Sequence, residues 1–115
     1  MTQTIKQGTT TGIKASDLRI DGVLTDMTGW SIHAVLRRDH VAGAIVAEWH
    51  TTPTGSQGQA VAGNGTAELK ITPAMSSPWT WSRGVVHAEA TEPGVNGRVA
   101  RIIDEDVYLD REAVT

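Results

Sequence analysis

Apolar and polar residues alternate along most of this chain, and the alternation has a period of two. The clearest run covers residues 30–38, where alternate positions are apolar: Trp30, Ile32, Ala34 and Leu36. A second run covers residues 45–51, whose apolar side is formed by Ile45, Ala47 and Trp49. Because side chains of a β-strand point alternately to its two faces, both runs predict strands with one buried face. The short segment between them, residues 39–43, predicts a hairpin connection.

The rest of the chain adds further predicted strands, the first two of them weaker: residues 3–8, 12–20, 66–72, 81–91 and 98–109. The last strand breaks its own alternation, because Arg101 and Glu105 fall among the apolar positions. An extra residue in one strand shifts all later side chains to the opposite face. We therefore expect a β-bulge at residues 104–106.

Two connecting segments have distinctive compositions. Residues 52–65 contain one proline and several glycines, with serine and glutamine between them, and this composition predicts a mobile loop. Residues 73–78 begin and end with proline and are too short for a regular helix. They predict a single helical turn, with Met75 filling the edge of the core.

Short strands at this spacing, separated by glycine and proline turns, predict an all-β fold. No segment of helical periodicity competes with this interpretation. We expect one domain over residues 1–115, built as an immunoglobulin-like β-sandwich of about seven antiparallel strands. Since the chain contains no phenylalanine, Trp30 and Trp49 are expected to supply the bulk of its core.

Composition and charge narrow the possible functions. The chain has 115 residues, no cysteine and a formal net charge of −3. A negative charge argues against binding through a nucleic-acid backbone, and the absence of cysteine excludes disulfides and thiolate chemistry. The longest apolar run, residues 41–47, is too short to cross a membrane. We therefore expect neither nucleic acid nor membrane among the partners.

The order of short motifs resembles a known family. The motifs occupy residues 5–10, 24–32, 67–72 and 107–115, and the most specific is Asp26-Met27-Thr28-Gly29-Trp30. Together they resemble the small immunoglobulin-like virion proteins of tailed bacteriophages, including the N-terminal domain of upper baseplate proteins. Within this resemblance Met27 replaces the usual leucine, and residues 78–81 depart from the expected glycine and aromatic residue.

The resemblance implies a structural protein of the phage particle, placed in the tail, the baseplate or on the capsid surface. Its partners would be other phage structural proteins and copies of itself, and its location would be the virion, assembled in the host bacterial cytoplasm. It implies no catalytic residue and no cofactor. The contacts would involve strand edges, the termini and the loop over residues 52–65.

Histidines raise the possibility of a metal site. His33, His50 and His87 share the outward side of three predicted strands, and their rings would converge if those strands were neighbours. The alternative is that outward strand positions simply carry polar residues. We favour this alternative and expect no metal, because neighbouring positions for all three strands do not follow from the sequence.

Charged residues form a second candidate site. Asp104, Glu105 and Asp106 concentrate negative charge near the C-terminus, but alternate residues of a strand cannot all face one calcium ion. We expect a solvated face, or a sheet edge protected by charge. A third interpretation pairs Asp104 and Asp106 with Arg37 and Arg38 of a neighbouring subunit.

Enzymatic function is not expected, since the chain has no Gly-x-Ser-x-Gly motif and Gly63-Asn64-Gly65 lacks the lysine of a phosphate-binding loop.

Trp79 and Trp81 leave more than one function open. They are expected to form a lid over one end of the sandwich. Alternatively, they anchor another protein, or stack on sugars in a carbohydrate-binding module.

Overall fold

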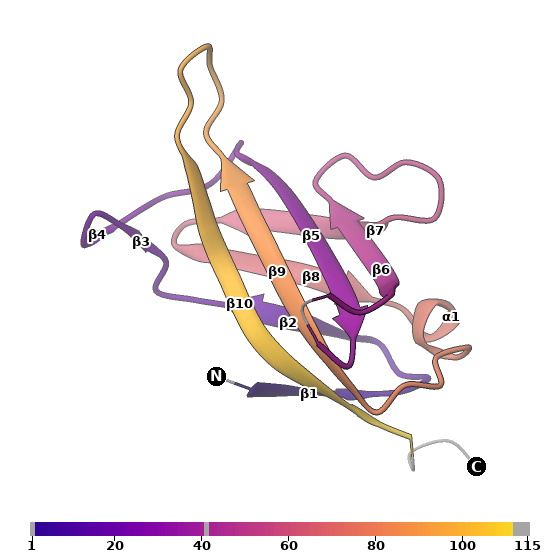
Figure 1. The fold of residues 1–115 in the computed structure, drawn as a ribbon. Coiled ribbons are helices and arrows are strands. Elements are labelled where there is room, and N and C mark those ends of the chain that lie inside the picture. Colours follow the sequence, from indigo (N-terminus) through magenta and orange to yellow (C-terminus); the bar gives the residue numbers. More distant parts are fainter. Residues whose placement is uncertain (1, 41, 112–115) are drawn as a thin grey trace.

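The computed structural model describes residues 2–40 and 42–111, and it is built almost entirely of β-strands (Figure 1). The strands are β1 (Thr2–Lys6), β2 (Thr11–Ala15), β3 (Arg19–Ile20), β4 (Val23–Leu24), β5 (Ser31–Arg38), β6 (Ile45–His50), β7 (Gly58–Gly63), β8 (Thr66–Ile71), β9 (Arg83–Thr91) and β10 (Val99–Asp110). The one helix in the described residues is α1 (Pro73–Ser76). The predicted all-β class is confirmed, and no described helix is long and apolar enough to span a bilayer.

Eight of the strands form one mixed sheet that curls into a nearly closed barrel (Figure 1). Its order is β1-β10-β9-β5-β6-β7-β8-β2, while β3 and β4 form a separate two-stranded ribbon. The expectation of antiparallel strands throughout is wrong at two places, because β1 pairs in parallel with β10 and β6 with β7. The β6–β7 pair involves only Trp49 with Gly58 and His50 with Gln59.

A strand lies inside the segment that was expected to be a mobile loop. β7 pairs with β8 over Ala60–Gly63, and Ala60 is buried in the core. The glycines that suggested a loop have a packing role here. A Cβ atom at Gly58 would lie 2.6 Å from Cδ1 of Trp49, so only glycine lets β7 pass this ring without displacing it.

The bulge in β10 lies earlier than predicted. The register shifts between Arg101 and Ile103 rather than at residues 104–106. This shift turns Arg101 outward, but Glu105 stays on the inward side of the strand, where Nε2 of Gln3 donates a hydrogen bond to its carboxylate. Glu105 therefore stays on the inward side without a second bulge, because its carboxylate is hydrogen-bonded at the margin of the sheet.

A second bulge, which the sequence did not reveal, lies between β5 and β6. Leu36 pairs with Ala47 but Arg37 pairs with Ile45, so Val46 is the extra residue. The prediction that Ile45 faces inward is therefore wrong, and its side chain is 50% exposed. Val46 packs against the core in its place.

The tryptophan core is confirmed. Trp49 is completely buried, and its indole N–H donates to the carbonyl of Lys70 at 2.8 Å, which links β6 to β8 across the barrel. Trp30 is also buried, and the guanidinium of Arg98 lies 5.7 Å from its ring centre. These two tryptophan rings supply bulk to the core of a chain that contains no phenylalanine.

The helical turn is confirmed as well. The Thr72 hydroxyl accepts the Met75 N–H and caps α1, while Pro73 occupies the first turn, where no donor is needed. Met75 is partly buried against the core, as expected. The turn carries the chain from β8 toward the start of β9.

Candidate functional site

Trp79 and Trp81 lie in the segment between α1 and β9. Both are buried, with 8% and 6% of their surface exposed, and their ring centres are 5.3 Å apart. Both rings therefore belong to the buried core, and a sugar would have to displace neighbouring side chains to stack on either face; their role as a lid stays a prediction. Among the described residues, the indole nitrogen of Trp81 has no hydrogen-bond partner although it is buried.

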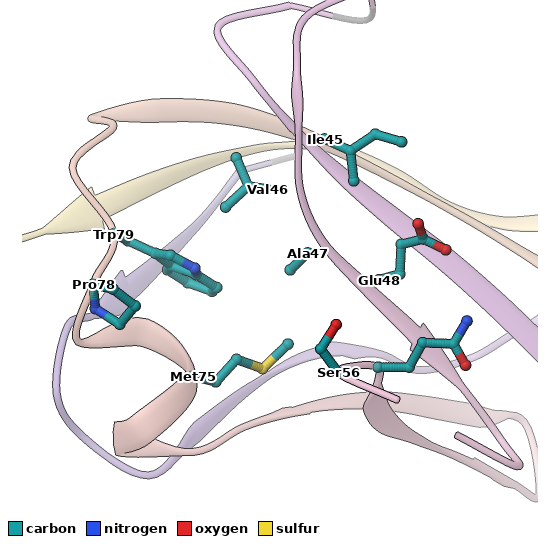
Figure 2. Close-up of a pocket in the computed structure, with 9 residues that line it drawn as sticks. Ile45, Val46, Ala47, Glu48, Ser56, Met75, Pro78 and Trp79 are labelled. Atoms are coloured by element: carbon teal, nitrogen blue, oxygen red, sulfur yellow. The ribbon is translucent and has the colours of Figure 1, made fainter. Parts of the chain in front are cut away.

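A groove lies beside Trp79, between α1 and β6 (Figure 2). It has a volume of about 520 Å³, and its lining mixes polar and apolar surface; the apolar side chains come from Ile45, Val46, Ala47, Met75, Pro78 and Trp79. Ser56 and Gln57 reach it from the loop before β7, and Glu48 is its one charged residue. The groove exists because β7 covers only the last two residues of β6, which leaves residues 45–48 beside an open space.

The wall of the groove formed by α1 is held in place by the first turn of the chain. The side-chain nitrogen of Gln7 lies within 2.9 Å of the carbonyl oxygens of Ser76, Ser77 and Trp79. The Gly8 N–H donates to the buried Ser76 hydroxyl at 2.8 Å. Since these contacts join segments about 70 residues apart, the groove is a preformed feature of the folded barrel.

The outer face of β5, β6 and β9 carries the histidines. His33 and His50 are directly paired, with ring centres 5.9 Å apart, and both line a shallow hollow together with His87. His87, however, contacts Asp104 at 3.0 Å, and within the described residues no three histidine or acidic side chains are arranged to hold a metal ion.

The local hydrogen bonding of His50 also opposes metal binding. Its Nδ1 accepts the Thr52 N–H at 3.0 Å, so the ring proton of the neutral form sits on Nε2. Nε2 would have to lose this proton before it bound a metal.

The charged residues singled out in the sequence have partners within the chain. Asp104 contacts His87 and Arg101, and Asp106 lies 3.4 Å from Arg83. Arg37 donates to the carbonyl of Gly43, and Arg38 lies 3.9 Å from Asp39. The structure does not bring the two arginines to the two aspartates, so the pairing between subunits stays a prediction.

The hairpin between β9 and β10 projects beyond the sheet at the end away from α1 (Figure 1). Its base is locked because the Arg98 guanidinium donates to both carboxylate oxygens of Glu92, at 3.2 and 2.8 Å. These hydrogen bonds lower the pKa of Glu92 and raise that of Arg98. A Cβ atom at Gly97 would lie 1.8 Å from the Glu92 carbonyl oxygen, so glycine permits the tight tip, where Val95 is fully exposed.

The sequence singled out Trp79 and Trp81 but did not indicate the groove or the tip. The groove depends on the bulge at Val46 and on the short β6–β7 overlap, neither of which has a local signal. Val95 was visible as an apolar residue within a glycine and proline turn.

No protein-family model matches this chain, and a search of curated proteins finds no match.

Proposed function

We propose that this protein is a non-enzymatic structural component of a tailed bacteriophage particle, acting through contacts with other virion proteins and with copies of itself. Its place would be the tail, the baseplate or the capsid surface. The support from the sequence is the resemblance of its motif order, centred on residues 26–30, to small immunoglobulin-like virion proteins.

The strand order supports the immunoglobulin-like part of this proposal. The series β10-β9-β5-β6 corresponds to strands G, F, C and C′ of a variable-type immunoglobulin domain, and β7-β8-β2 corresponds to D, E and B. The contact between β6 and β7 joins the two series into one curled sheet. A two-sheet sandwich joined at this corner has the same neighbouring strands as the nearly closed barrel.

The groove is the observation that carries the proposed mechanism of protein contact. Apolar side chains, together with Glu48, Ser56 and Gln57, line a preformed hollow at the surface, and Met75 within it adapts easily to the shape of a partner. Such pockets bind the apolar anchor residues of partner proteins, because burying them removes apolar surface from water on both sides. The loop expected to make contacts contributes Ser56 and Gln57 to its wall.

Particle composition tests this function. Phage particles from the host that carries the gene are purified on a density gradient and analysed by mass spectrometry and immunogold labelling. We expect the protein at a fixed stoichiometry to the major virion proteins, with labelling at one station. Its absence from purified particles would contradict the proposal.

A further inference from the structure

Both asparagines of this chain, Asn64 and Asn96, are followed by glycine. Asparagine is a chemically labile residue, and a glycine after it has no side chain to keep its backbone nitrogen away from the asparagine amide. The two sites therefore share the same local chemistry. A difference in their reactivity has to come from the tertiary structure.

Asn64 lies in a closed part of the fold, between β7 and β8. The next residue, Gly65, is buried; its N–H donates to the Thr25 carbonyl at 2.9 Å, and its carbonyl accepts the Leu18 N–H at 3.0 Å. Asn64 itself forms a β-bridge with Asp26. To attack the Asn64 side chain, the Gly65 nitrogen would have to give up its hydrogen bond and move within a buried turn. The fold therefore protects this site.

Asn96 lies at the exposed tip of the hairpin that projects from β9 and β10 (Figure 1). The N–H of the next residue, Gly97, donates to the Gly94 carbonyl at a distance of 3.4 Å. This distance is longer than is usual for an N–H···O hydrogen bond, so the bond is weak. Exposed loop tips are also the places where a chain is least restrained. The Gly97 nitrogen can therefore approach the Asn96 side chain at little cost.

The base of the hairpin keeps the tip in this exposed position. The Glu92 N–H donates to the Arg98 carbonyl at 2.8 Å, and the Arg98 guanidinium binds both oxygens of the Glu92 carboxylate. Because the restraint lies at the base, the tip can move while the strands stay paired. A reaction at Asn96 therefore needs no unfolding of the sheet.

We propose that Asn96 is a site of spontaneous deamidation in the folded protein, whereas Asn64 is protected. The Gly97 nitrogen forms a bond to the side-chain carbonyl carbon of Asn96, and its proton passes to the side-chain nitrogen, which leaves as ammonia. A water molecule then opens the resulting cyclic imide. Breaking the new carbon–nitrogen bond gives aspartate, and breaking the original peptide bond gives isoaspartate. The reaction needs water alone as co-reactant, and it does not depend on the proposed function.

The modification changes the tip in two ways. Either product adds a negative charge to a chain whose formal net charge is −3. Isoaspartate also adds a methylene group to the backbone, at a turn where a Cβ atom on Gly97 would lie 1.8 Å from the Glu92 carbonyl oxygen. The Arg98 N–H donates to the Glu92 carboxylate at 3.3 Å. Because the turn is too tight for added atoms, we expect this N–H to exchange faster in the isoaspartate form.

The test follows both asparagines by mass spectrometry of proteolytic peptides while the purified chain is incubated at mildly alkaline pH. In the folded chain we expect aspartate and isoaspartate to form at Asn96 at least about tenfold faster than at Asn64, where reaction requires local opening. In guanidinium chloride the hydrogen bonds of the fold are lost, so the two sites should react at similar rates.

Two matched variants locate the reaction. Asn96→Gln keeps the amide but lengthens the side chain, which disfavours ring closure, so the tip should stay unmodified. Asn64→Gln, the same change at the protected site, should leave the rate at Asn96 as it is in the natural chain.

Several results would overturn the inference. One is an Asn96 that stays intact in the folded chain over the time in which the denatured chain reacts. Another is an equal rate at both asparagines in the folded chain, or a difference between them that persists in guanidinium chloride, since either result would remove the role of the fold. Aspartate without isoaspartate would show direct hydrolysis of the amide, without attack by Gly97.

Discussion

The four tryptophans show how strongly the role of one residue type depends on its surroundings. Trp49 and Trp81 are both buried, but only the indole N–H of Trp49 has an acceptor, the Lys70 carbonyl. A buried donor without an acceptor has lost its bond to water and gained nothing in exchange. Trp49 is therefore a polar link across the core, whereas Trp81 serves by its volume alone.

This difference predicts unequal effects of the same substitution. Trp49→Phe removes ring volume and also deprives the Lys70 carbonyl of its donor, while Trp81→Phe removes volume together with an unpaired donor. We expect Trp49→Phe to lower the free energy of unfolding by about 1–3 kcal/mol more than Trp81→Phe. Urea unfolding of both variants measures this. Equal losses would show that the Trp49 hydrogen bond contributes nothing.

The ionisation of Glu92 is expected to make the stability of the β9–β10 hairpin depend on pH. Hydrogen bonds from Arg98 lower the pKa of Glu92 in the folded chain. Its contribution to stability is therefore present above the usual glutamate pKa of about 4.3, and it is lost as the pH falls through the lowered value. We expect amide exchange at Arg98 to accelerate on acidification below that range, once corrected for the intrinsic exchange rate. Glu92→Gln should exchange rapidly at neutral pH and lose this acid-induced change.

At the scale of the element, the junction of β6 and β7 organises the molecule. The two strands share only two residue pairs, yet these pairs join the two series of strands into one sheet. The junction requires Gly58, since its missing side chain is what lets β7 lie against the Trp49 ring. The groove opens beside the part of β6 that does not pair with β7.

Gly58→Ala tests this packing. The added methyl group would meet Trp49 at 2.6 Å and Met75 at 3.0 Å, and the Trp49 ring is completely buried. We expect a loss of about 1–3 kcal/mol in stability and a change in tryptophan fluorescence. Ser56→Ala, two residues earlier and exposed, is the control and should unfold at the same temperature as the natural chain.

At the scale of the whole molecule, one side chain completes the barrel where strand pairing ends. The amide of Gln3 on β1 donates to the Lys14 carbonyl at 2.9 Å and accepts the Lys14 N–H at 3.1 Å. It thereby occupies the place of a peptide group in a ladder between β1 and β2. The seam between the first and last strands of the sheet is closed by this amide.

Gln3→Met keeps the length of the side chain and removes both hydrogen bonds to Lys14, together with the one to the Glu105 carboxylate. We expect a loss of about 1–2 kcal/mol in unfolding free energy and faster hydrogen exchange at Lys14. Thr2→Ala, on the same strand and exposed, should change the stability by less than about 0.5 kcal/mol. Unchanged exchange at Lys14 in the Gln3 variant would mean that the seam is closed by other contacts.

The alternation of residues predicted most strands because a half-buried strand leaves a local imprint on the sequence. It predicted β5, β8 and the inward face of β9 in this way. It failed where one added residue reset the alternation, as at Val46 and near Arg101, and where glycines served packing rather than a loop, as at Gly58. In each case the cause lies in the pairing or packing against the neighbouring strand, which the alternation within a single strand does not show.

The sequence by itself determined the all-β class, the tryptophan core and the helical turn, because these depend on side-chain polarity and on local backbone preferences. Only the tertiary structure decided the parallel pairs, the bulges, the Gln3 seam and the groove. These depend on which strands become neighbours, and long-range pairing is set by the burial of the whole sheet rather than by any short segment.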